Sequence, residues 1–353
     1  MNLRSLSDGA PARRVARLLA AAVLLTACAG SDGTGPEPVP SVARVEVTPV
    51  EGAVVVGGAV RFSARALTAA GEVVQGGSVA WATDDPKVAT VDPSGLVTAL
   101  SLGTVTVTAT VHGVTGGALL SVHGPTEPPF QGTAFLHPGL IVPSDPSSFQ
   151  TLTPTGRGLR TMFDRRVEDW VTVEAYLFEA TFEAGRTVEL QVNPELGSQE
   201  AAAVEAKSYA EVIGQLPATL RRDVETVWIH RGEEPFGGGN RNLLIHLEQG
   251  EHYAADGFLE EILVHEAVHT SLDADHAGSP GWLAAQTEDG VFISSYAEDF
   301  PAREDLAESF VPWMAVRRLS DRLPETTRNL ILATIPNRIA YLDALAVDWE
   351  PVP

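Results

Sequence analysis

The chain has 353 residues, which is long enough for two domains with separate hydrophobic cores. It carries 24 Lys and Arg residues against 46 Asp and Glu residues, which gives a formal net charge of −22. This charge argues against nucleic acid or an anionic lipid surface as a partner, because both would repel the protein.

Residues 1–28 have the composition of an export signal. Arginines precede a short apolar run from Leu18 to Leu25, which is too short to span a bilayer. Small residues then lead to Cys28, the only cysteine in the chain, so an intramolecular disulfide is impossible. The segment resembles the signal of bacterial lipoproteins, which implies cleavage before Cys28 and lipidation of that residue. An ordinary signal peptide with a chance cysteine is the alternative interpretation.

This resemblance implies an exported bacterial lipoprotein that is anchored in a membrane through lipidated Cys28. Ala29 follows the cysteine, and a residue other than Asp at that position implies the outer membrane in double-membrane bacteria. Residues 29–40 are rich in Gly, Ser, Pro and Asp and are predicted to form a flexible tether. The expected location is therefore the outer membrane or the cell surface.

Residues 41–123 are predicted to form an all-β sandwich with Trp81 in its core. Alternating apolar and polar residues predict strands at 43–48, 59–66, 79–82, 88–91, 96–99 and 104–111. The sequences VEVTP (45–49), VAWATDDPKVATVDPSGLVTAL (79–100) and GTVTVTATV (103–111) resemble the bacterial Ig-like domains of group 2. The resemblance implies a spacer, and the segment has no cluster of aromatic residues that would favour binding.

Residues 124–130 are rich in proline and predict a stiff linker before a second domain over 131–353. This domain is predicted to be α+β, because a mixed sheet comes first and helices follow. The expected elements are a β-hairpin at 173–183 and 187–192, a helix at 199–213, strands at 224–230 and 243–247, a helix at 257–272 with Asp256 as its N-cap, and helices at 305–322 and 325–346, the last broken at Pro336.

The glycine-rich segment 236–240 lies between two predicted strands. It lacks the Lys-Ser/Thr end of a phosphate-binding loop and opens no helix, which argues against nucleotide binding. We expect a mobile turn beside an edge strand, and such a strand could hold an extended peptide by main-chain pairing.

The motif His265-Glu266-Ala267-Val268-His269 lies in a predicted apolar helix. Two histidines four residues apart share one face of a helix, so both imidazoles can bind one zinc ion. Glu266 lies between them and can accept a proton from the water that the zinc ion activates. Two histidines in an apolar helix need polar partners, because a buried polar group without a partner is unfavourable. A metal ion would be such a partner, and a pair of structural histidines bonded to carboxylates is the alternative.

A catalytic zinc site also needs a third protein ligand. Asp275 and His276 lie just downstream, but the metzincin spacing would require a glycine where this chain has Leu272. The sequences HEAVHTSLDA (265–274), SSYA (294–297) and EDLAESF (304–310) resemble gluzincin metallopeptidases, especially those similar to anthrax lethal factor. The resemblance favours Glu304 as the third ligand over Asp275 or His276.

The same resemblance assigns two supporting residues in a zincin-like domain. Glu308, one helical turn after Glu304, is expected to hydrogen-bond a zinc-binding histidine. Tyr296 matches a tyrosine that assists the oxyanion or the leaving group, although its spacing to Glu304 is one residue longer than expected. His230 and His252 are scattered, and we expect His246 to be structural rather than part of the cleft.

The sequence therefore predicts a zinc metallopeptidase with a peptide or protein as its substrate. Two other functions compete with it. One is a non-catalytic surface adhesin with a degenerate zincin domain, and the intact Glu266 argues against it. The other is an amidase that acts on cell-wall peptides.

Overall fold

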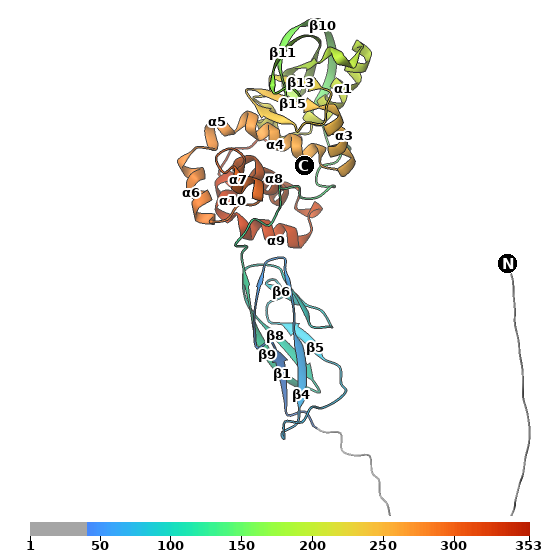
Figure 1. The fold of residues 1–353 in the computed structure, drawn as a ribbon. Coiled ribbons are helices and arrows are strands. Elements are labelled where there is room, and N and C mark those ends of the chain that lie inside the picture. The colour runs from blue at the N-terminus through green and yellow to red at the C-terminus, as the bar shows by residue number, and fades with distance from the viewer. Residues whose placement is uncertain (1–40) are drawn as a thin grey trace, which may run out of the picture. The chain divides into compact units, whose positions relative to one another are not determined.

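The computed structural model describes residues 41–353, and Figure 1 labels its elements. The predicted signal peptide, the lipidation of Cys28 and the tether over 29–40 lie outside the described residues and stay predictions. None of the helices within 41–353 is long and apolar enough to cross a membrane.

The N-terminal domain consists of β-strands, as predicted. Its strands are β1 (Arg44–Thr48), β2 (Glu51–Val55), β3 (Ala59–Arg61), β4 (Ser63–Leu67), β5 (Ala80–Thr83), β6 (Ala89–Val91), β7 (Leu96–Ala99), β8 (Gly103–Val111) and β9 (Val114–His123). Strands β2, β9, β8 and β5 form one sheet, β3, β7 and β6 form a second, and β1 pairs with β4. Valines and alanines of β8 fill the core between the sheets.

Two details of this domain differ from the sequence analysis. The predicted strand at 59–66 divides at Phe62, so that β3 and β4 belong to different sheets. Phe62 is 1% exposed and occupies the core, whereas Trp81 is only half-buried at the margin of the core. The prediction that Trp81 fills the core is therefore wrong.

Strands β2 and β9 were not among the predicted elements. Strand β9 contains Gly116 and Gly117, and glycines weaken the pattern from which a strand is recognised. A Cβ atom at Gly116 would overlap the carbonyl oxygen of Val45 in β1. The glycine is thus needed where the backbones of β1 and β9 approach each other.

The C-terminal domain is α+β, as predicted, and contains a six-stranded mixed sheet. The strand order is β10-β11-β12-β13-β15-β14, with β12, β13 and β15 parallel and the other pairs antiparallel. The strands are β10 (Phe149–Asp164), β11 (Asp169–Phe182), β12 (Thr187–Val192), β13 (Thr226–His230), β14 (Gly237–Gly239) and β15 (Asn242–His246).

The predicted β11–β12 hairpin is confirmed, but two other features of the sheet are new. Strand β10 was not predicted, because Pro154, Gly156 and Gly158 interrupt its alternating pattern. A register shift between Pro154 and Gly156 accommodates these residues. The glycine-rich segment forms strand β14 at the end of the sheet, so it is itself the edge strand rather than a turn beside one.

The helices are α1 (Gln199–Ile213), α2 (Ala218–Arg221), α3 (Leu247–Asp256), α4 (Leu259–Ser271), α5 (Asp273–His276), α6 (Pro280–Asp289), α7 (Ser295–Asp299), α8 (Asp305–Arg318), α9 (Glu325–Thr334) and α10 (Pro336–Asp343). Helices α1 and α2 lie between β12 and β13 in the chain, and the other helices follow β15. Helices α4 to α10 lie below the sheet in Figure 1. Helix α1 has the predicted bounds, and the predicted break at Pro336 separates α9 from α10.

The start of the histidine-bearing helix differs from its prediction. Asp256 does not cap α4 but ends α3, a helix that the sequence analysis missed. Gly257 then adopts a left-handed conformation with φ 79°, which ends α3. Phe258 precedes α4 without a side-chain cap, and α4 is buried between β14 on the sheet and α8 among the helices.

Candidate metal centre and cleft

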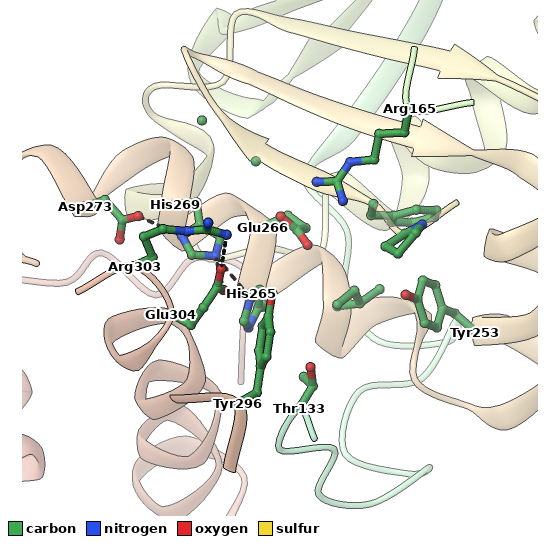
Figure 2. Close-up of a pocket in the computed structure, with 15 residues that line it drawn as sticks. Thr133, Arg165, Tyr253, His265, Glu266, His269, Asp273, Tyr296, Arg303 and Glu304 are labelled. Carbon is green, nitrogen blue, oxygen red and sulfur yellow. Dashed lines mark hydrogen bonds and ion pairs between the residues drawn. The ribbon is translucent and has the colours of Figure 1, made fainter. Parts of the chain in front are cut away.

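Helix α4 brings His265 and His269 together. It contains neither glycine nor proline, and its side chains are buried nearly all round, which is typical of a helix inside a domain. The two imidazoles lie one turn apart on the same face, with their Nε2 atoms 3.1 Å from each other. Both rings face the cleft shown in Figure 2.

Glu304 completes a group of three with the two histidines. It immediately precedes α8, and its Oε2 atom lies 3.1 Å from His269 Nε2 and 3.4 Å from His265 Nε2. Ligands at about 2.0–2.1 Å around a tetrahedral zinc ion lie about 3.3–3.4 Å from one another. The three residues could therefore hold one metal ion, and the separations of their ligand atoms are close to those of zinc ligands.

Carboxylates also face the other ring nitrogens of the two histidines. His269 Nδ1 lies 2.7 Å from Asp273 Oδ2, and His265 Nδ1 lies 3.4 Å from Glu308 Oε1. Glu308 accepts hydrogen bonds from Ala134 N at 2.7 Å and Ser294 Oγ at 2.6 Å, which fix its carboxylate. This arrangement turns Nε2 of each ring toward Glu304, as a metal site requires.

Glu308 was predicted in this role, and Asp273 was missed. Asp273 follows His269 by four residues, so this spacing was a signal available in the sequence. The two alternative third ligands do not join His265 and His269. Asp275 is exposed, and His276 Nδ1 lies 2.8 Å from the hydroxyl of Tyr341.

The backbone explains why Asp275 and His276 do not join the two histidines. The metzincin pattern needs a sharp turn three residues after the second histidine. Here the chain continues from Leu272, which is 3% exposed, into the helical turn α5. This turn carries both side chains away, and within 41–353 the group that could hold an ion consists of His265, His269 and Glu304.

Electrostatics keep the Glu304 carboxylate ionised. Burial by itself would raise the pKa of Glu304, but hydrogen bonds with His265 and His269 hold it well below its ordinary value. Burial likewise opposes charge on His269, yet Asp273 and Glu304 raise its pKa to about 10. Burial raises the pKa of Glu308, against the opposing influence of His265 and Ser294.

The group lines a cleft of about 540 Å³, which Glu266 and Tyr296 also line. Tyr296 belongs to α7, and its ring stands beside His265 and Glu304 in Figure 2. Burial and the nearby Glu304 carboxylate raise the pKa of Tyr296, so its hydroxyl stays protonated at neutral pH. Phe236, Tyr253 and Ile262 form an apolar end of the same cleft.

The glycines of β14 allow the sheet to meet α4 directly at Glu266. Side-chain carbon at Gly238 would overlap the carbonyl group of Glu266. Thr270 joins the two elements, because its Oγ1 accepts a hydrogen bond from Gly239 N at 2.8 Å and donates to Asn242 O at 2.9 Å. The edge strand and the histidine-bearing helix are thus held together along one side of the cleft.

The remaining histidines lie outside the cleft. His230 and His246 are fully buried at the ends of β13 and β15, where their rings stack 5.7 Å apart near Asp164. Burial lowers the pKa of His230 to about 4, so the ring is neutral at physiological pH. His246 is absent from the lining of the cleft, in line with a structural role, and His252 is exposed on α3.

Comparison with known proteins concerns the N-terminal domain. Residues 41–122 match the family described as the bacterial Ig-like domain (group 2), which confirms the domain predicted over 41–123. Such a domain indicates a surface or extracellular protein. The search of curated proteins gave no match.

Solved structures of S-layer protein SbsC are among those similar to the chain. Its domains 4 and 5 align at 20% identity and a TM-score of 0.22, covering 24% of this chain and 53% of that one. Its domains 5–6 align at 14% identity and a TM-score of 0.22, covering 44% of this chain and 98% of that one. The chain thus spans about half of the first of these structures.

Proposed function

We propose that the C-terminal domain is a zincin-like, zinc-dependent peptidase of the gluzincin type. The observation that carries the proposal is the triangle of His265 Nε2, His269 Nε2 and Glu304 Oε2, with sides of 3.1–3.4 Å, in the lining of a cleft. Two imidazoles and a carboxylate, with one position left open, are the donor set of catalytic zinc sites. A purely structural zinc site has four protein ligands, whereas this group has three and borders a cleft.

The residues around the triangle have the roles that amide hydrolysis requires. Zinc held by His265, His269 and Glu304 would supply Lewis-acid activation of water and of a carbonyl group. Glu266 lines the same cleft and takes a proton from the attacking water, then returns it to the leaving amine nitrogen. Tyr296 directs its hydroxyl toward the substrate carbonyl and stabilises the negative charge that develops on its oxygen.

The edge strand β14 supports a peptide as the substrate. It ends the sheet, pairs only with β15 among the described strands, and lines the cleft with Gly238 and Gly239. An extended peptide can pair with such an edge through main-chain hydrogen bonds, while its side chains enter the apolar end of the cleft. The cleft volume of about 540 Å³ accommodates several residues.

The proposed location is the outside of the cell. The signal at 1–28 and its terminal Cys28 support an exported lipoprotein, and the matched Ig-like domain supports a stalk that holds the peptidase away from the membrane. The net charge of −22 remains unfavourable for binding nucleic acid.

The test is cleavage of a synthetic peptide library and of muropeptides by the purified chain, with its metal removed and restored. We expect cleavage of peptides that stops after treatment with a chelator and returns with stoichiometric zinc. Cleavage of muropeptides alone would favour a cell-wall amidase. Stoichiometric zinc without cleavage of either substrate would favour a non-catalytic surface protein.

A further inference from the structure

Two neighbouring arginines at the β10–β11 turn have opposite surroundings. Arg165 and Arg166 follow Asp164, the last residue of β10, and the turn returns the chain to Asp169 in β11. Arg166 is fully engaged in ion pairs. Arg165 is exposed, and its guanidinium has no hydrogen bond or ion pair with any residue from 41 to 353.

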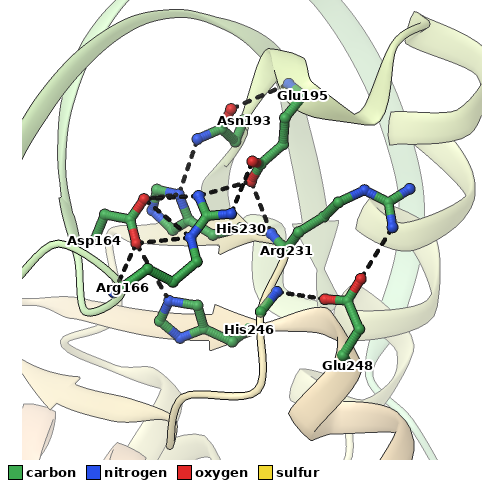
Figure 3. Close-up of polar contacts among 9 residues, drawn as sticks. Asp164, Arg166, Asn193, Glu195, His230, Arg231, His246 and Glu248 are labelled. Atoms are coloured by element: carbon green, nitrogen blue, oxygen red, sulfur yellow. Dashed lines mark hydrogen bonds and ion pairs between the residues drawn. The ribbon is translucent and has the colours of Figure 1, made fainter.

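The Arg166 network fixes the turn that carries Arg165 (Figure 3). Arg166 Nη2 donates to Asp164 Oδ2 at 2.7 Å, and Arg166 Nη1 donates to Glu195 Oε2 at 2.8 Å. Asp164 is 4% exposed, and its bonds to Arg166 hold its pKa near 2, despite the opposing effect of burial. Glu195 also accepts a hydrogen bond from Arg231 N at 2.8 Å, which joins the turn to the end of β13.

Arg165 extends from this fixed turn over the edge strand and into the cleft. It lines the same cleft as Glu266, and Figure 2 shows its guanidinium pointing toward that residue. A Cβ atom at Gly237 would lie 2.8 Å from Arg165 Nη2, so the absence of a side chain there leaves room for the guanidinium. The other arginine of the cleft, Arg303, already donates to Glu304 Oε1 at 3.0 Å.

We propose that Arg165 pairs with a carboxylate of a peptide bound along β14, so that the cleft selects acidic peptides. This inference rests on the proposed peptidase function and names its substrate class. A guanidinium presents paired N–H donors that match a carboxylate, and a fixed turn lowers the entropic cost of the pairing. In a chain with a net charge of −22, an unpaired cation in the cleft also offsets the repulsion of acidic peptides.

The carboxylate belongs either to an Asp or Glu side chain or to the C-terminus of the peptide. A random peptide library with free C-termini and one with amidated C-termini distinguish these sources. Cut sites are read by mass spectrometry for the zinc-loaded full chain. We expect Asp and Glu enriched by about 10-fold at one fixed position in both libraries, or cuts at a fixed distance from a free C-terminus in the first library only.

Substitutions then test whether Arg165 causes the selection. Arg165→Ala should abolish the enrichment, Arg165→Glu should replace it with enrichment of Lys and Arg, and Gly237→Ala should weaken it by displacing the guanidinium. Arg222→Ala removes an arginine that is 58% exposed, pairs with Asp223 and lies outside the cleft, so the preference should be unchanged. Arg165→Ala that retains the acidic preference would overturn the inference.

A binding experiment separates this inference from the peptidase proposal. The same libraries are passed over immobilised, zinc-loaded Glu266→Gln protein with and without Arg165→Ala, and the retained peptides are sequenced. Acidic peptides retained only when Arg165 is present, together with no cleavage by the wild type, would support the inference and refute the peptidase function. No Arg165-dependent preference in either experiment would refute the inference.

Discussion

Glu266→Gln is expected to lower kcat for peptide hydrolysis by roughly 10²–10⁴-fold and to leave the zinc content at that of the wild type. Glutamine has nearly the same shape as glutamate but cannot accept the proton of the attacking water. Glu266 is absent from the group of His265, His269 and Glu304, so its substitution removes no metal ligand. Steady-state kinetics on a cleaved library peptide, with metal analysis of the same samples, measures both effects.

Glu298→Gln is a matched control for this substitution. Glu298 is exposed on α7, close in sequence to Tyr296, and does not line the cleft. We expect its kcat to stay within about twofold of the wild type, as for a surface change away from the reacting groups. A Glu266→Gln protein with wild-type kcat would contradict the role of Glu266 as the general base.

Arg338→Met should destabilise the C-terminal domain by roughly 3–5 kcal/mol, because it leaves two buried carboxylates without their cation. The side chains of Arg338, Asp289 and Asp305 are fully buried. Arg338 Nη1 donates to Asp289 Oδ2 at 3.0 Å, and Arg338 Nε donates to Asp305 Oδ2 at 2.9 Å. Asp305 is the first residue of α8, so this network also fixes the backbone next to Glu304.

Chemical unfolding of the full chain, followed by tryptophan fluorescence, measures this effect, since all the tryptophans except Trp81 lie in the C-terminal domain. Arg317→Met is the matched control. Arg317 forms a two-point ion pair with Asp343 at 2.7 and 2.8 Å, but its side chain is 38% exposed. We expect this control to cost less than about 1 kcal/mol. Equal losses of unfolding free energy in Arg338→Met and Arg317→Met would contradict the prediction that burial makes the Arg338 network the more stabilising of the two.

The sequence was informative where local chemistry alone fixes the structure. The pattern of Gln199–Ile213 predicts a helix of the observed length, because its alanines favour a helix and Gly214 and Pro217 stop it. In the structure Ser198 caps its start. The histidine spacing predicts that His265 and His269 meet, since one helix determines their separation. The position of Glu304 came from a family resemblance, and the structure brings that carboxylate to both rings.

Contacts between segments that are far apart in the sequence could not be predicted from local patterns. Arg338 and Asp289 resemble solvated surface charges in the sequence, and only the packing of α6, α8 and α10 buries them together. In the sequence, the glycines of β14 resemble a flexible turn. In the structure, a side chain at Gly238 would overlap the backbone of Glu266, and one at Gly237 would approach the Arg165 side chain. Arg165 was not predicted either, because it lies in the turn after the unpredicted strand β10.

Zinc content by mass spectrometry tests most directly the proposal that His265, His269 and Glu304 hold one zinc ion. Loss of a residue that only supports a metal ligand costs about 10–100-fold in affinity, so loss of a direct ligand should exceed that. We predict one zinc ion per chain in the wild type and in Asp275→Ala, and loss of zinc in His265→Ala and Glu304→Ala. Glu304→Ala protein that binds zinc as tightly as the wild type would contradict this proposal.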